Sequence, residues 1–211
     1  NPLRLALLVL LAVFLAPLLL RTVWWFTRVE AAPTWSRADW SSARLLPEPA
    51  AHDAALVRVY AARVGRWRGI AAHHSWIVVK EKGAARYTRF DKVGWGSPVR
   101  TNGWPADGRW YGNEPSLLAA VDGEEAERMI PRIRSAVDSY EYRRAGDYRA
   151  WPGPNSNTFV AQVLTDAAPD LVAALPPTAL GKDWLAPHRI VALTPSGTGF
   201  RLSLAGYAGL T

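Results

Sequence analysis

Two short motifs combine residue types that could carry out acyl transfer or hydrolysis. The first, His73–Trp76, places two histidines at the head of an apolar run that is typical of a β-strand. The second, Asn155–Thr158, stands directly before apolar residues at helical spacing. A nucleophile at the start of a helix gains from unpaired backbone N–H groups and from the helix dipole, which stabilise developing negative charge. An imidazole presented from a strand can serve such a nucleophile as general base.

Each motif also has a purely structural interpretation. Serine is among the best N-cap residues and stabilises a helix by about 1 kcal/mol there, so Ser156 could act as a cap alone. His73 and His74 are neighbours on the predicted strand, so their side chains point to opposite faces and only one can enter a site. We assign His74 to the site and expect His73 to be a hydrogen-bonded structural residue. Residues 147–149 (Asp-Tyr-Arg) either fold over Ser156 or form a solvated turn.

The order of the motifs resembles that in the circularly permuted papain-like families, which include the PPPDE peptidases, the lecithin:retinol acyltransferase type and permuted NlpC-type peptidases. In these families a strand histidine precedes an Asn-Cys-x-x-Phe-like helix start that bears the nucleophile. The resemblance covers residues 70–165. It implies that His74 is the base and Ser156 the nucleophile, with Asn155 and Phe159 as the flanking family residues.

The same resemblance implies a third polar residue on the strand after the histidine. Tyr87, Arg89 and Asp91 are the candidates, and we choose Asp91 because a carboxylate can orient an imidazole. The chain departs from the families at the nucleophile, where Ser156 replaces cysteine. A thiol with a pKa near ~8.5 is partly ionised at neutral pH, whereas a hydroxyl reacts only with the help of a well-placed base.

The motifs support two hypotheses of different class for the function. In the first, the chain is a serine-dependent hydrolase or acyltransferase, in which Ser156, His74 and Asp91 act on a lipid or cell-wall substrate. In the second, the domain is catalytically inactive and serves as an accessory or assembly subunit of a larger membrane protein complex, which it contacts through its N-terminal helix.

The N-terminal segment predicts a single membrane-spanning helix within residues 1–30. From Leu5 to Leu20 the chain carries no charge, and the apolar stretch continues past Arg21 to Phe26. These residues make about 33 Å of helix at ~1.5 Å each, enough for a hydrocarbon core of ~30 Å. Tryptophans beside arginines at its end are typical of a membrane interface. The alternative is a signal peptide that is cleaved near residues 29–31 (Val-Glu-Ala).

The whole chain resembles a family of bacterial membrane-anchored proteins without an assigned activity. We expect a single-pass protein of the inner membrane, with the lipid bilayer as its first partner. One arginine precedes the apolar segment and two follow it closely, so the positive-inside rule mildly favours a cytoplasmic domain. N-terminal anchor helices with only a short segment before them, however, usually export the domain that follows. We predict export, which places the globular domain in the periplasm.

Composition excludes several classes of site. The chain has no cysteine, which rules out disulfides, a zinc ribbon and a cysteine nucleophile. Its 4 histidines show no ligand spacing, so we predict neither a metal nor another cofactor. The net charge is +7, and all 25 basic residues except Lys80, Lys82, Lys92 and Lys182 are arginine. These arginines are interleaved with acidic residues and form no recognisable nucleic-acid motif, so we expect no nucleic-acid partner.

The rest of the chain predicts an α+β fold, a small antiparallel sheet packed with two or three helices. We interpret residues 31–55, rich in Ala, Pro and Ser, as a tether, and residues 56–211 as the globular domain. Within it we expect strands at 55–64, 75–80 and 86–93, helices from Glu124 and after residue 157, and a hairpin from 190–193 and 200–204. The long loop 94–113 carries Trp104, Trp110 and Tyr111, which could line a substrate cleft or form a satellite core.

Overall fold

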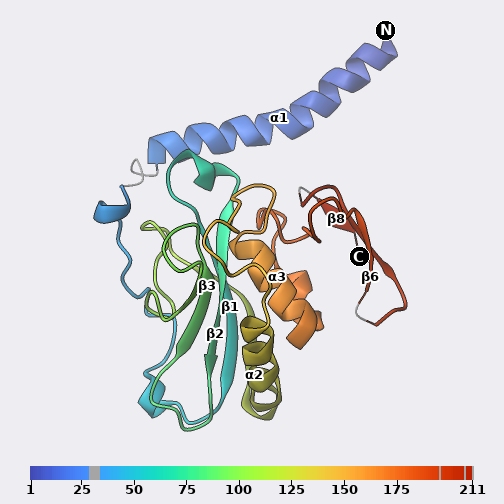
Figure 1. The fold of residues 1–211 in the computed structure, drawn as a ribbon. Coiled ribbons are helices and arrows are strands. Elements are labelled where there is room, and N and C mark those ends of the chain that lie inside the picture. The colour runs from blue at the N-terminus through green and yellow to red at the C-terminus, as the bar shows by residue number, and fades with distance from the viewer. Residues whose placement is uncertain (29–33, 195, 207, 211) are drawn as a thin grey trace.

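The computed structural model describes residues 1–28, 34–194, 196–206 and 208–210. It confirms the predicted α+β class: a five-stranded antiparallel sheet packs with helices, and a long apolar helix precedes it (Figure 1). The helices are α1 (Pro2–Arg28), α2 (Gly123–Asp138) and α3 (Ser156–Ala167), and the short 3₁₀ turns are η1 (Trp35–Arg37), η2 (Pro49–Ala51), η3 (Arg66–Ile70) and η4 (Pro169–Ala174). The strands are β1 (Leu56–Arg63), β2 (His73–Lys80), β3 (Thr88–Lys92), β4 (Val99–Thr101), β5 (Ser116–Asp122), β6 (Val191–Leu193), β7 (Phe200–Ser203) and β8 (Gly209–Leu210).

The large sheet has the strand order β4-β3-β2-β1-β5, with antiparallel neighbours throughout. Its central strands are rich in Val, Ile and aromatic residues, which suit a sheet that is covered on both faces. Alternation along β2 sends Ile77 and Val79 to one face and Trp76 and Val78 to the other. The register places Ile77 opposite Phe90 of β3, so the two strands share the same division of faces.

Helices α2 and α3 cover the first of these faces, which we call the helix face (Figure 1). The helical spacing that predicted α2 is confirmed, since its buried residues Ala126, Ile130, Ile133 and Val137 recur every three or four positions. In α3, Phe159 and Leu164 are fully buried against the sheet. This face is the main apolar core of the molecule.

Irregular chain covers the opposite face, which we call the loop face. The predicted loop 94–113 contributes Trp104, Trp110 and Tyr111 to a second cluster, and it includes the short strand β4. Residues 34–55 of the predicted tether lie against this loop: the carboxylate of Asp107 accepts hydrogen bonds from the Ser42 hydroxyl (2.6 Å) and the Leu45 amide (2.6 Å). Residues 31–33 of that tether lie outside the described residues.

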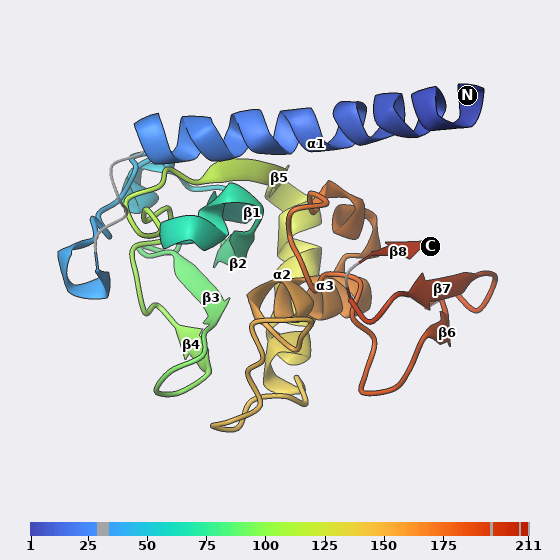
Figure 2. The ribbon, with the colours of Figure 1, turned by 90° about the horizontal axis from the view of Figure 1, so that it is seen from above.

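A separate three-stranded sheet in the order β6-β7-β8 comes after the helices. The predicted hairpin is confirmed, since Val191 pairs with Leu202 and Leu193 with Phe200, and β8 extends it by one strand. Figure 2 shows this small sheet beyond α3, away from β1 to β4.

Helix α1 is long and apolar enough to cross a membrane by length and composition. It runs along one side of the domain (Figure 2), and its apolar window is not buried. Its last turns make the contact with the domain, where Trp25 is 3% exposed and lies against Gly69 of η3. The signal-peptide alternative depended on residues 29–31, which lie outside the described residues.

Candidate functional site

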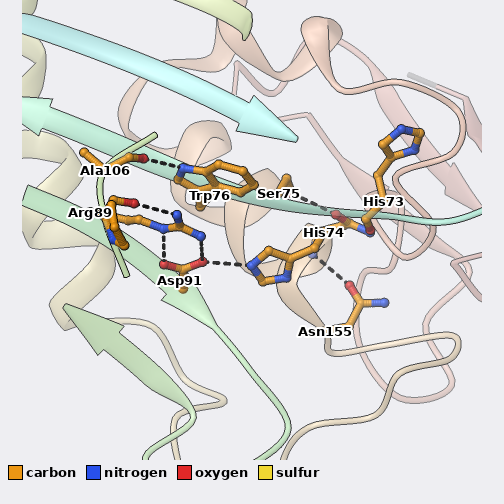
Figure 3. Close-up of polar contacts among 10 residues, drawn as sticks. His73, His74, Ser75, Trp76, Arg89, Asp91, Ala106 and Asn155 are labelled. Atoms are coloured by element: carbon orange, nitrogen blue, oxygen red, sulfur yellow. Dashed lines mark hydrogen bonds and ion pairs between the residues drawn. The ribbon is translucent and has the colours of Figure 1, made fainter. Parts of the chain in front are cut away.

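His74 and Asp91 form a buried pair on the loop face. They come from the neighbouring strands β2 and β3, and the Nε2 atom of His74 lies 2.8 Å from Oδ1 of Asp91 (Figure 3). Arg89, two residues before Asp91 and on the same face, donates to both carboxylate oxygens, from Nε at 2.6 Å and from Nη2 at 2.9 Å. The three side chains are 0–2% exposed. A two-donor fork of this kind fixes the carboxylate in the plane of the guanidinium.

The protonation states result from this arrangement. Burial raises the pKa of the Asp91 carboxyl, but the charge of Arg89 and the hydrogen bonds from His74 and Arg89 outweigh it and hold the pKa below its ordinary value. Burial lowers the pKa of His74 below its ordinary value, although Asp91 opposes this shift. A neutral imidazole facing an ionised carboxylate must carry its proton on Nε2, because a carboxylate only accepts. Nδ1 is therefore the basic nitrogen of His74.

Aromatic rings enclose the pair. Trp110 stacks on the imidazole of His74 with 3.7 Å between ring centroids and 7° between planes. The guanidinium of Arg89 lies 4.0 Å from the ring centroid of Trp76, whose Nε1 donates to the carbonyl of Ala106 at 2.8 Å. Stacking and cation–π contact thus fix both partners of Asp91. Of the loop aromatics proposed to line a cleft, Trp110 packs directly on the predicted base.

Asn155, and not Ser156, caps α3. Its Oδ1 accepts from the amides of Asn157 (2.9 Å) and Thr158 (3.1 Å), and the Thr158 hydroxyl accepts from the amide of Asn155 in a capping box. Gly181 packs so close to Asn155 that a Cβ there would meet the amide at 2.5 Å. The structural interpretation of Ser156 as the N-cap is therefore wrong, because its neighbour fills that role. Ser156 is the first residue of the helix, and its hydroxyl is not used for capping.

Tyr148 folds over Ser156, as one of the two interpretations of residues 147–149 predicted. Its phenol interacts with both the side chain and the backbone of Ser156. Burial raises the pKa of the Tyr148 phenol, and the contact with Ser156 opposes this shift. Gly94 makes the approach possible, since a Cβ at that position would lie 2.8 Å from the Tyr148 ring. The loop before α3 thus closes over the start of the helix.

The structure brings His74 and Asp91, two of the three predicted catalytic residues, into direct contact. Within the described residues no hydrogen bond joins Ser156 to His74. His74 lies on the loop face, whereas α3 packs on the helix face, where Asn157 accepts from the Ser75 hydroxyl at 2.8 Å. Ser156 is 3% exposed and His74 2% exposed, so both are closed to solvent in this conformation.

His73 points to the helix face, as the alternation predicted. The expectation of a hydrogen-bonded ring is met in part: the ring is hydrogen-bonded to the backbone of Thr178, whereas its Nδ1 is buried without a partner. Burial, with smaller effects from the charges of Arg63 and Arg21, lowers the pKa of His73 to about 4. The backbone of His73 is also bonded: its amide donates to the carbonyl of Thr178 and its carbonyl accepts from Asn157. The ring of His73 is therefore neutral at neutral pH.

Arg89 belongs to the site although only Asp91 was chosen for the third family position. The two residues are two apart on a strand and so share a face, a spacing that predicts a pair. Tyr87, the remaining candidate, donates its hydroxyl to the carbonyl of Pro47 and does not reach His74. The stacking of Trp110 has no local signal in the sequence, because it depends on how the long loop folds back. Among the described residues no group of three or more His, Asp or Glu side chains could hold a metal ion.

Comparison with known proteins gives one match. Residues 54–184, more than half of the chain, match the sequence model of a family described as "Protein of unknown function (DUF3750)". The matched region runs from β1 to beyond η4, and so contains His74, Asp91, Tyr148 and Ser156 but neither α1 nor the small sheet. Neither the curated proteins nor the solved structures gave a match.

Proposed function

Since the chain belongs to this DUF3750 family, whose function is unknown, we propose an activity from its site: serine-dependent acyl transfer or amide hydrolysis by a membrane-anchored domain. Ser156 is the nucleophile, His74 the base and Asp91 the residue that orients the base. The observation that carries this proposal is the 2.8 Å contact between His74 and Asp91, which leaves Nδ1 of the imidazole as a base.

The chemistry takes the usual course of acyl transfer. The Ser156 hydroxyl attacks the carbonyl carbon of an ester or amide, its proton passes to Nδ1 of His74, and the same proton is then given to the leaving group, which leaves the acyl group on Ser156. Water or an acceptor hydroxyl or amine, deprotonated by His74, then takes the acyl group, and the proton returns to Ser156. The amides of Asn157 and Thr158 are occupied by Asn155, and the backbone of Ser156 is hydrogen-bonded to the Tyr148 phenol. The amide of Ser156 can therefore donate to the developing oxyanion only after Tyr148 moves away. The reaction requires the loop that carries Tyr148 to open and His74 to come within ~2.6–3.2 Å of Ser156.

Helix α1 supplies the membrane anchor in this proposal. Its apolar length supports a single crossing, and the tryptophans at its C-terminal end support an interface at that level. We place it in the inner membrane with the domain in the periplasm, where lipids and cell-wall polymers offer esters and amides. A protease added outside intact spheroplasts tests this: digestion of the domain is expected, and protection until lysis would overturn the orientation.

A serine-directed fluorophosphonate tests the activity. The full chain in detergent should be labelled, and Ser156→Ala should abolish the label while Ser135→Ala, an exposed serine on α2, should leave it unchanged. His74→Gln should slow the labelling at least about 100-fold, the usual contribution of a general base. Labelling that persists in Ser156→Ala, or a correctly folded parent that is never labelled, would contradict the proposal.

A second function has its own support in the closed site. Ser156 and His74 are both buried and are not bonded to each other, as expected of a domain that has lost activity and acts as an accessory or assembly subunit. This alternative predicts that the chain, solubilised gently from its native membrane, purifies in a stoichiometric complex and takes no fluorophosphonate label. Purification as a labelled monomer would rule it out.

A further inference from the structure

The 3₁₀ turn η3 presents two arginines and a tryptophan to solvent beside the end of α1. Arg66, Trp67 and Arg68 are all exposed, and Trp67 is 64% exposed. Arg66 also has a φ of 58°, a left-handed conformation that costs a non-glycine residue free energy. A strained arginine beside an exposed tryptophan is not explained by packing within the domain.

Contacts beneath the turn hold it at the level of Trp25 in α1. A Cβ on Gly69 would lie 2.4 Å from the Trp25 ring, so the backbone of η3 and this ring are in close contact. Arg63 donates from Nη1 to the carbonyls of Gly69 (2.6 Å) and Ile70 (3.0 Å), and its guanidinium lies 5.8 Å from the Trp25 ring centroid. Because tryptophans at the end of a membrane helix lie among the headgroups, η3 lies at that depth as well.

We propose that η3 binds the anionic phospholipid headgroups of the bilayer, with Arg66 and Arg68 on phosphate oxygens and Trp67 in the interface. The proposal rests on the proposed insertion of α1. Guanidinium groups match phosphate oxygens with two parallel hydrogen bonds, and tryptophan prefers the interface because its ring is apolar and its N–H polar. Each basic residue close to an anionic leaflet adds about a fivefold preference for the bound state.

The position of η3 also relates this contact to the candidate site. The charge of Arg68 acts on the phenol of Tyr148, which in turn contacts Ser156. Three residues after η3, the chain enters β2 with His73 and His74. A lipid held by η3 is therefore held at the end of the domain where the loop over Ser156 must open.

The absence of cysteine allows a direct test with a single label. In the full chain, Trp67→Cys carries the polarity-sensitive fluorophore NBD, and the protein is reconstituted in vesicles of phosphatidylcholine alone or in an equimolar mixture with phosphatidylglycerol. The control label is at Glu127→Cys, an exposed position on α2, which Figure 1 shows at the end of the domain far from α1. We expect a blue-shifted emission and quenching by brominated lipid at position 67 in the mixed vesicles, and neither effect at position 127.

The arginines are tested by substitution in the labelled protein. Arg66→Gln with Arg68→Gln should lower the ratio of bound to unbound label about 25-fold in the mixed vesicles, whereas Arg128→Gln with Arg132→Gln on α2 should not change it. Arg66→Gly should weaken binding about fivefold and yet not destabilise the domain, since glycine adopts this φ freely. Equal emission at position 67 in both vesicle types, with α1 resistant to carbonate extraction, would overturn the proposal for η3 alone. Extraction of the parent chain by carbonate would instead overturn the insertion of α1.

Discussion

The two faces of the large sheet are both buried, but they differ in the elements that cover them and in the residues beneath. The helix face is covered by regular helices and has an apolar centre formed by Ile133, Phe159 and Leu164, with a few polar groups such as Ser75 and Asn157 towards one end. The loop face is covered by irregular chain and buries Arg89, Asp91 and His74 among tryptophans. Apolar contacts tolerate small shifts, whereas buried charges require every partner in place. The comparison indicates that the helix face mainly stabilises the fold, whereas the loop face fixes the positions of Arg89, Asp91 and His74.

The loop face should suffer most from the loss of a single partner. Asp91→Ala leaves Arg89 and His74 buried without their shared acceptor, so we expect a loss of about 3–5 kcal/mol in the free energy of unfolding. Urea denaturation monitored by tryptophan fluorescence measures it. As a control, Asp122→Ala removes the ion pair with Arg58 at a half-exposed carboxylate and should cost below about 1 kcal/mol. Equal losses of stability in the two variants would contradict the view that Asp91 is required as the shared acceptor of Arg89 and His74.

At the apolar centre of the helix face, the free energy of unfolding should depend on the volume of the buried side chains. Leu164→Ala removes a fully buried side chain of α3 and should cost about 2–5 kcal/mol. Leu164→Met keeps the volume and should cost less than about 1.5 kcal/mol. The same urea titrations measure both, and a Met variant as unstable as the Ala variant would contradict the view that this face is ordinary apolar packing.

The free energy of unfolding should decrease in acid because of His73, whose ring lies on the helix face. Its pKa is about 4 in the folded chain and ~6.5 when unfolded, so the unfolded chain binds the extra proton between these values. Stability is therefore full above pH ~6.5 and falls as the pH decreases towards 4, with a slope of at most about 1.4 kcal/mol per pH unit from this ring. Urea unfolding at several pH values measures the slope. His73→Gln should reduce the slope by this amount and leave the contribution of His74, whose pKa burial also lowers. An unchanged slope would assign the acid sensitivity to other groups.

The smallest effects should separate the two residues at the start of α3. Asn155→Ala removes the cap and should cost about 1–2 kcal/mol. Ser156→Ala removes only the contact of its hydroxyl with Tyr148 and should cost about 0.5–1 kcal/mol. Thermal unfolding of the two variants side by side gives the comparison. A Ser156→Ala variant as unstable as Asn155→Ala would show that Ser156 also stabilises the start of α3.

The fold was largely predictable because its elements have simple periods. Alternation and β-branched residues indicated β1, β2 and β3, and the spacing of Ala126 and Ile130 indicated α2. We did not predict β5 (Ser116–Asp122), which is an edge strand whose Leu117 is half-exposed and so lacks the alternation of a covered strand. Strand β4 was also missed, because it is short and lies inside the predicted long loop.

The site was predictable only where it depends on neighbouring strands. Once β2 and β3 pair, a histidine on one and an aspartate on the other can meet, as His74 and Asp91 do. Whether Ser156 reaches them depends on the path of α3 and of the loop with Tyr148, which are tertiary features without a local pattern. The choice of cap between Asn155 and Ser156 was also open, since both residue types favour that position.

The contact between Trp25 and Gly69 also sets how far the domain can travel. Residues 34–55, fully extended, would reach about 70 Å, long enough for a domain to move well away from its anchor. Here Trp25 packs on Gly69, and Ser42 within residues 34–55 is hydrogen-bonded to Asp107, so these residues lie against the domain and do not extend away from it. With α1 inserted, the domain diffuses in two dimensions, and it encounters molecules that are themselves confined to the membrane surface.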